Sequence, residues 1–196
     1  MIIIKHRVNN SKELKRLNND YGVEIDLRSN NKQIYLHHDP YVKGELFSKW
    51  IKYYDHKLLV LNVKEEGLEE QILKILKKNK IKKFFFHDQT FSTILKNMHH
   101  TNVSIRFSEY EGLKKMNMLF NKIKWLWVDN FTKINLEKNF FLFLKKKDVK
   151  ICIVSPELVK KERIKEINNI ISKLKKNNLK IDAVCTKQPK LWLKYY

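Results

Sequence analysis

The stretch KLLVLNVKEEGLEEQILKILKKNKIKKFFFHD, residues 57–88, reads as a strand, a helix and a second strand. KLLVLNVK and KKFFFHD are short runs rich in β-branched and aromatic residues, which favour strands. Between them, GLEEQILKILKKN places four apolar side chains on one stripe of a helix: Leu68, Ile72, Ile75 and Leu76. This order predicts two parallel strands that are joined by a helix.

The same alternation continues along the whole chain. Further strand candidates are MIIIKH, GVEIDLR, QIYLHH, VSIRFSE, KWLWVDNF, VKICIVS and IDAVCTK, and further helix candidates are SKELKRLNND, with Ser11 as N-cap, and PELVKKERIKEINNIISKLKKNN. If QIYLHH returns beside GVEIDLR, eight strand units remain, which is the count of a (β/α)₈ barrel. We therefore predict an α/β fold, a compact and trimmed TIM barrel with short loops, over residues 1–196 as one domain. An open doubly wound sheet is the alternative, and the lack of a Gly-rich phosphate loop after any strand disfavours it.

Composition indicates an ordinary soluble chain. Of the 196 residues 43% are hydrophobic, enough for one substantial core, and four Gly and three Pro leave no flexible linker. Cys152 and Cys185 lie in apolar runs, as expected for reduced, buried thiols. The N-terminal apolar run is too short for a signal peptide, and no segment has the ~20 apolar residues of a membrane span. A cytoplasmic location is the expectation.

The chain is strongly basic, with a formal charge of +20. Nearly all of the excess is Lys, and the Lys runs fall at predicted helix ends, where cations suit the macrodipole and water. Readers of bases and phosphates favour Arg, so a specific nucleic-acid partner is not expected. A solvated basic surface is the preferred interpretation, and weak attraction to an anionic membrane or glycan is a secondary one.

Polar residues close almost every predicted strand. Glu24 and Asp26 lie two apart, hence on one face of their strand, and two buried like charges require a positive partner such as a metal ion, an Arg or a Lys. In a parallel barrel the carboxyl ends of the strands meet at one rim. That rim is predicted to hold His6, Arg7, Glu24, Asp26, His38, Asn62, Lys64, His87, Asp88, Arg106, Glu109 and Asp129. For His87, Asp88 and Glu109 a simple loop charge is an equally good interpretation.

These residues resemble a known family. KHR, then GVEIDLR, then a strand ending HHDP are similar to the HR, G-x-x-x-E-x-D and HDP motifs of the glycerophosphodiester phosphodiesterases, a group of the phospholipase C-like barrels. LNVK, residues 61–64, and IDAVCTKQP near the C-terminus resemble later strands of that family more weakly. The resemblance is dense only over residues 4–64.

The resemblance implies a phosphodiester hydrolase. In that family's pattern His6 and His38 would be the general acid and base, and Glu24, Asp26 and Asn62 would bind a divalent cation, Mg²⁺ or Ca²⁺. Arg7 and Lys64 would bind the substrate phosphate, with Arg106, Glu109 and Asp129 as further rim residues. The expected partner is a small-molecule or lipid-headgroup phosphodiester, and the family chemistry includes attack by a substrate hydroxyl that gives a cyclic phosphate.

Three departures from the family pattern leave other functions open. Asn62 stands where a third metal carboxylate is usual, and Lys187 replaces a common Asp. Only a short segment separates Pro40 from the next parallel strand. This short segment suggests an open site for a glycerol-, saccharide- or lipid-linked substrate. The first alternative is a barrel that has lost catalysis and binds a phosphorylated ligand, with Asn62 as its main support. A basic nucleic-acid-binding protein is the less favoured alternative, since only the net charge supports it. The sequence does not give the oligomeric state.

Overall fold

Eight parallel strands form the centre of the computed structural model, which describes residues 1–99, 102–111, 119–133 and 137–195. They are β1 (Ile2–Lys5), β2 (Gly22–Asn30), β5 (Leu59–Val63), β6 (Phe84–His87), β7 (Ser104–Phe107), β8 (Trp125–Val128), β9 (Lys150–Val154) and β10 (Ala183–Thr186). Their order in the sheet is β6, β5, β2, β1, β10, β9, β8, β7. The first and last strands are therefore neighbours, because β1 pairs with β10 on one side and with β2 on the other.

One contact brings the two ends of this sheet together. Phe86 of β6 forms a parallel bridge with Val103, just before β7, and the Phe86 N–H donates to the Asn102 carbonyl at 2.7 Å. The neighbouring pairs, β5 with β6 and β7 with β8, are continuous ladders. The arrangement is a (β/α)₈ barrel, so the predicted fold class is confirmed and the open doubly wound alternative is wrong.

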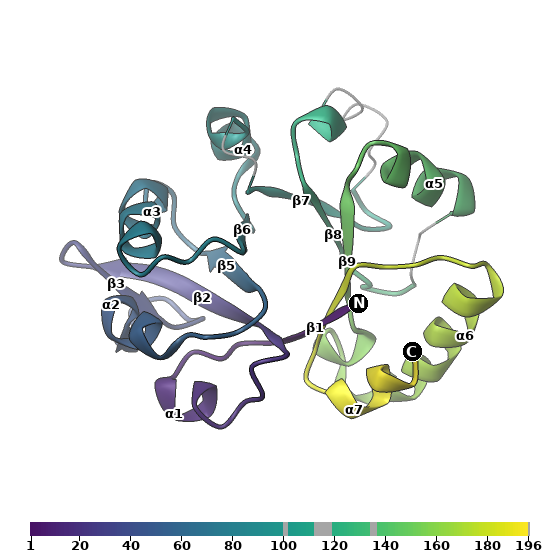
Figure 1. Ribbon diagram of the computed structural model, residues 1–196, viewed down its shortest axis with the longest axis horizontal. Helices are drawn as coiled ribbons and strands as arrows, with labels where there is room; N and C mark the ends of the chain where they lie inside the picture. The colour runs from purple at the N-terminus through teal and green to yellow at the C-terminus, as the bar shows by residue number, and fades with distance from the viewer. Residues whose placement is uncertain (100–101, 112–118, 134–136, 196) are drawn as a thin grey trace.

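Helices surround the strands in chain order (Figure 1). They are α1 (Ser11–Leu14), α2 (Phe47–Trp50), α3 (Glu69–Lys78), α4 (Phe91–Asn97), α5 (Lys138–Lys146), α6 (Ile167–Lys176) and α7 (Pro189–Trp192), with 3₁₀ turns at Ile51–Tyr53, Leu119–Asn121, Pro156–Leu158, Lys161–Glu166 and Leu193–Tyr195. No helix within the described ranges combines the length and the apolar composition needed to cross a bilayer.

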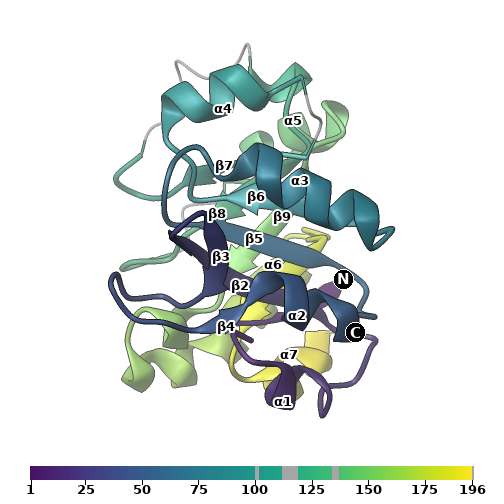
Figure 2. The ribbon, with the colours of Figure 1, turned by 90° about the vertical axis from the view of Figure 1, so that its left-hand side faces the viewer.

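A hairpin rises from the carboxyl end of β2. Residues 27–30 continue past the barrel and pair antiparallel with β3 (Gln33–Leu36), which also pairs with the short β4 (Glu45–Leu46). Asn31 and Lys32 both have positive φ, 48° and 63°, as in the two-residue type I′ turns of hairpins. The predicted return of QIYL beside β2 is confirmed, and the hairpin lies at the opposite end of the molecule from the two termini (Figure 2).

The strands are apolar on both faces because one face packs on the helices and the other fills the barrel. The barrel interior is a separate cluster of buried side chains that includes Ile4, Val60, Phe85, Trp125 and Trp127. Cys152 and Cys185 belong to this cluster as free thiols, and burial raises the pKa of both, so they act as small apolar residues as predicted.

Two helix predictions need correction. The first helix is a single turn whose N-cap is Asn10, not Ser11, because the Asn10 side chain accepts the Glu13 N–H at 2.8 Å. The long helix predicted from Pro156 is two 3₁₀ turns followed by α6. In the second turn, Arg163 donates to the carbonyls of Asn130 and Phe131 at 2.6 and 2.7 Å. These tertiary contacts hold the segment against the residues that follow β8, and it forms 3₁₀ turns there and not a continuous α-helix.

Candidate active site

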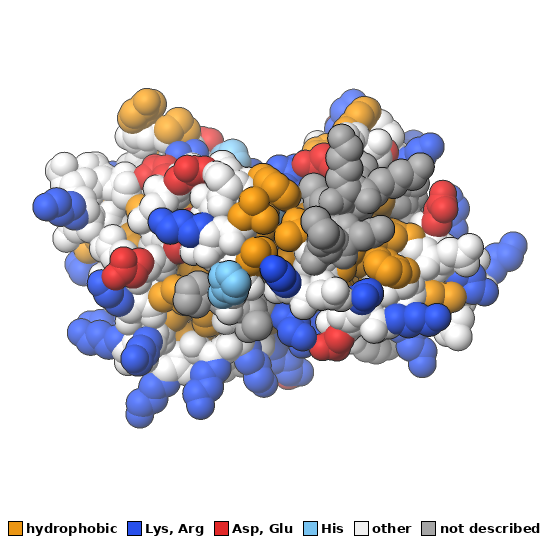
Figure 3. Space-filling view, turned by 90° about the horizontal axis from the view of Figure 1, so that it is seen from above, with side chains coloured by type: hydrophobic (Ala, Val, Ile, Leu, Met, Phe, Trp, Pro, Cys, Tyr) orange, Lys and Arg blue, Asp and Glu red, His pale blue; other side chains and the backbone are white. Residues whose placement is uncertain are grey.

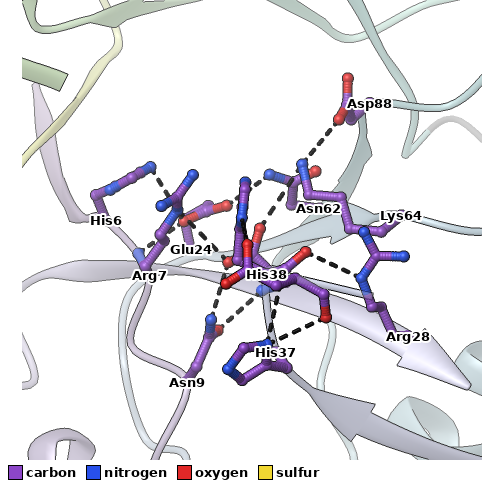
Figure 4. Close-up of polar contacts among 12 residues, drawn as sticks. His6, Arg7, Asn9, Glu24, Arg28, His37, His38, Asn62, Lys64 and Asp88 are labelled. Carbon is purple, nitrogen blue, oxygen red and sulfur yellow. Dashed lines mark hydrogen bonds and ion pairs between the residues drawn. The ribbon is translucent and has the colours of Figure 1, made fainter. Parts of the chain in front are cut away.

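Six of the predicted site residues come from three neighbouring strands at the carboxyl rim. His6 and Arg7 follow β1, Glu24 and Asp26 lie in β2, and Asn62 and Lys64 lie in and just after β5. Asp26 is the register partner of Asn62. Figure 4 shows five of these side chains, His6, Arg7, Glu24, Asn62 and Lys64, grouped together with His38.

Glu24 is buried and held from two sides. Its Oε1 accepts from the Asn62 side-chain amide at 2.8 Å, and its Oε2 accepts the Arg7 backbone N–H at 2.7 Å. Arg7 adopts a left-handed conformation (φ 56°), which a non-glycine residue rarely takes, and this directs the N–H onto the carboxylate. Burial, followed by the charge of Asp26, raises the pKa of Glu24 to about 7. The carboxylate pair is thus costly to ionise without a further cation.

Two oxygens in this cluster lack hydrogen bonds. Asp26 is fully buried, and its Oδ2 accepts from Asn9 at 2.8 Å. Its Oδ1, like the Oδ1 of Asn62, accepts no hydrogen bond from any described residue, and the Lys64 ammonium lies 3.7 Å from the Asp26 Oδ1. Buried acceptors without donors are uncommon in native proteins and point to an unseen partner.

A divalent cation fits these open oxygens. Carboxylate and amide oxygens are the ligands that Mg²⁺ and Ca²⁺ prefer. Within the described part of the chain no three His, Cys, Asp or Glu side chains gather to hold a metal ion. The candidate set contains only two carboxylates, from Glu24 and Asp26, and Asn62 supplies the third oxygen.

His6 lies beside the carboxylate pair. Its Nε2 is 4.0 Å from Glu24 Oε2, and its Nδ1 is buried without a partner among the described residues. Burial, followed by the positive charges of Arg7 and Lys187, lowers the pKa of His6 to about 3. The imidazole is therefore neutral at physiological pH and able to accept a proton.

His38 reaches the rim by a different route from the one predicted. β3 ends at Leu36, so His38 lies in the following loop and not at the end of a strand. The His37 N–H donates to the Asp26 carbonyl at 3.2 Å, and Arg28 Nε donates to the His38 carbonyl at 2.9 Å. These two hydrogen bonds hold the loop against β2, and His38 Nδ1 is 2.8 Å from Asp39 Oδ1. The predicted strand QIYLHH therefore ends two residues early, and neither His37 nor His38 lies in it.

The cationic side chains are largely engaged in ion pairs across the rim. Lys64 Nζ is 2.9 Å from Asp88, which also receives Arg106 at 3.0 Å. Arg106 continues to Asp129 at 2.9 Å. Arg7 Nε is 3.7 Å from Asp26, and its side chain is 40% exposed, so it is more accessible to a ligand than Lys64 at 15%.

The remaining rim residues have structural contacts. Asp129 also accepts from Trp127 Nε1 at 3.1 Å, and Trp127 stacks on the buried His87 ring at 4.0 Å. Glu109 lies outside the ion-pair chain. Its Oε1 accepts the N–H and hydroxyl of Thr132, which joins the loops that follow β7 and β8.

Two residues near the carboxylates were not assigned a role from sequence. Asn9 contacts Asp26 twice, since its side chain both donates to Oδ2 and accepts the Asp26 N–H at 2.9 Å. Asp88 forms an ion pair with Lys64 at 2.9 Å and so fixes the position of its ammonium group. A loop Asn four residues after a strand carries no distinguishing pattern, whereas Asp88 had a signal in its strand-end position.

Comparison with solved structures identifies the relatives of this fold. A glycerophosphodiester phosphodiesterase from Agrobacterium tumefaciens superimposes with a TM-score of 0.69 at 8% identity, over 98% of this chain and 99% of that one. A glycerophosphoryl diester phosphodiesterase from Parabacteroides distasonis gives 0.68 at 13% identity, over 99% and 85%. The chain has the fold of the glycerophosphodiester phosphodiesterases. No protein-family model and no curated protein matches the sequence.

Each superposition covers nearly all of this chain and most or all of the solved structure, although few residues are identical. The fold of the glycerophosphodiester phosphodiesterases therefore occurs here with a largely different sequence. A shared fold does not fix the function, so the chemistry of this rim depends on the side chains that this chain places there.

Proposed function

We propose that this protein is a metal-assisted phosphodiester hydrolase of the glycerophosphodiester phosphodiesterase type. The observation that carries the proposal is the buried pair Glu24 and Asp26 at the carboxyl rim of this barrel, where one oxygen of Asp26 and that of Asn62 accept no hydrogen bond from any described residue. A structural role alone gives little reason to bury two like charges with open acceptors.

His6 and His38 are proposed as the proton-transfer groups. His6 is proposed as the base that accepts the proton of the attacking hydroxyl, because its neutral imidazole lies beside the carboxylate pair. The pKa of about 3 by itself makes His6 a weaker base than a free imidazole, so the proposal rests on its position. His38, oriented by Asp39, serves as the acid that protonates the leaving alcohol. When bound, a divalent cation polarises the phosphoryl oxygens and lowers the pKa of a hydroxyl nucleophile.

The phosphate is proposed to bind beside Arg7, the more accessible of the two cationic side chains. Lys64 is proposed to contribute charge while it remains between Asp26 and Asp88. The substrate class is a phosphodiester linked to glycerol, a saccharide or a lipid headgroup. The segment between Pro40 and β5 holds only short elements, β4, α2 and a 3₁₀ turn, which favours an open site.

A direct assay tests the proposal. Purified protein is incubated with bis(4-nitrophenyl) phosphate and with glycerophosphodiesters, in Mg²⁺, in Ca²⁺ and in chelator. We expect turnover that requires the cation. Cation binding without turnover of any substrate would favour a barrel that binds a phosphorylated ligand. The absence of both cation binding and turnover would refute the hydrolase.

The amide at position 62 gives a separate prediction. We expect Asn62→Asp to tighten divalent binding by roughly ten-fold, because it adds a charge of opposite sign within ligand distance. Isothermal titration with Mg²⁺ and Ca²⁺ measures the change. Asn130→Asp is the control, since Asn130 is a buried rim amide after β8 whose side chain contacts Arg163. Equal tightening in both variants would show that position 62 does not contact the cation.

A further inference from the structure

The connections that lead into the strands from the amino end of the barrel are rich in lysine. KKNKIKK (77–83) precedes β6, KKKDVK (145–150) leads into β9, and KLKKNNLK (173–180) precedes β10. All three lie at the same end because parallel strands share their amino ends. Here this surface is called the basic end. Within these three segments the only acidic residue is Asp148, which pairs with Lys124 from the connection before β8. Three further carboxylates lie in neighbouring connections at this end: Asp182 pairs with Lys145, Asp20 pairs with Lys57, and Asp55 precedes β5.

The opposite end of the barrel has a balanced charge. The connections that leave β5, β8 and β9 each carry carboxylates, among them Glu65, Asp129 and Glu157. The positive charge is therefore not spread evenly over the molecule. Figure 3 shows Lys and Arg side chains crowded along the lower edge of the view, the side that faces the viewer in Figure 1.

Helix stability accounts for only some of these lysines. Those in the last turns of α3, α5 and α6 favour the helix macrodipole. Lys82, Lys83, Lys147 and Lys180 lie beyond the helix ends, are exposed, and form no ion pair with any described residue. Like charges brought together without partners repel one another, so their clustering calls for an external anion.

We infer that the basic end docks on a bilayer surface that carries anionic phospholipids. The lysines come from separate connections around the end of the barrel, so they present a broad face of charge and not a single stripe. None of the five arginines, which suit bidentate recognition of nucleic-acid phosphates and bases, lies in these segments. Clustered lysines near an anionic membrane add their attractions within a Debye length of the surface.

This mode of docking has a consequence for the site. The two ends of a barrel face opposite ways, so the carboxyl rim would point away from the bilayer into solvent. The protein would be concentrated at the membrane while its rim remains open to soluble or projecting ligands. The inference does not depend on the proposed hydrolase activity, since it concerns only the opposite end of the molecule.

Vesicle flotation tests the inference. The whole protein is mixed with phosphatidylcholine vesicles, with or without phosphatidylglycerol, at low salt. We expect binding only to the anionic vesicles and its loss at about 1 M NaCl, where the Debye length is ~3 Å. The quadruple variant Lys82→Gln, Lys83→Gln, Lys147→Gln and Lys180→Gln should weaken binding on the order of 10³-fold.

A matched variant separates position from net charge. Lys43→Gln, Lys160→Gln, Lys161→Gln and Lys190→Gln together remove the same charge from exposed positions at the carboxyl side. This variant should bind anionic vesicles nearly as well as the wild type, and thermal melts confirm that both variants are folded. Equal loss in the two variants would overturn the inference. So would binding to a DNA duplex, measured by fluorescence anisotropy, without binding to anionic vesicles.

Discussion

The His6→Ala variant is expected to hydrolyse an aryl phosphodiester with a kcat roughly 10²–10⁴ lower than that of the wild type, the usual contribution of a positioned proton-transfer group. His6 Nε2 lies 4.0 Å from Glu24 Oε2, and burial keeps its imidazole neutral at physiological pH. His38→Ala should have an effect of similar size. Steady-state kinetics on both single variants and the double variant provide the measurement.

The double variant should be little worse than either single one, because groups that act as a unit are not additive. His37→Ala is the matched control, since His37 is adjacent to His38 and, among the described residues, its ring contacts the backbone of Asp39 alone, 3.0 Å from the N and 3.1 Å from the carbonyl oxygen. It should retain most of the activity. Loss of turnover in His37→Ala together with its retention in His38→Ala would contradict the assignment of His38.

The barrel was predictable because its signal is local. Each strand is a short apolar run, and the helix between β5 and β6 shows its period within a few turns. The same-face placement of Glu24 and Asp26 also follows from local geometry, since side chains alternate along any strand. The shared rim then needs only the rule that parallel strands end together.

The position of His38 was not predictable in the same way. The alternation of side chains stops where the strand stops, and β3 ends at Leu36, two residues earlier than the apolar run suggests. What places His38 is a pair of hydrogen bonds between its loop and β2, one from the His37 N–H to the Asp26 carbonyl and one from the Arg28 side chain to the His38 carbonyl. Such contacts join segments that a sequence pattern cannot pair.

Charge was the property that the sequence described least well. The Lys runs were interpreted as separate solvated helix ends, which is reasonable for each one alone. The fold brings the connections 77–83, 145–150 and 173–180 to one end of the barrel, so separate local features become one surface. Lys64 shows the reverse effect, because Asp88 partly neutralises an ammonium that the sequence had assigned to the substrate.

A divalent cation is expected to raise the melting temperature of the wild-type protein by roughly 5–10 °C. A ligand present at 100 times its Kd stabilises the native state by about 2.7 kcal/mol, and each kcal/mol shifts Tm by ~2–4 °C in a chain of this size. The stabilisation arises because the cation neutralises the buried pair Glu24 and Asp26. Asp26→Asn should abolish the shift, as it removes a ligand charge with little change of shape. Differential scanning fluorimetry with Mg²⁺ and Ca²⁺ measures it.

Asp129→Asn controls for the loss of a buried rim carboxylate as such. Asp129 is also buried, but its oxygens are taken by Arg106 and Trp127, so the variant should keep the full cation shift. The wild-type shift should also diminish as pH falls below about 7. The pKa of Glu24 is raised to about 7, so a proton competes with the cation for this carboxylate below that pH. A cation shift that persists in Asp26→Asn, or that disappears in Asp129→Asn, would place the cation elsewhere on the rim.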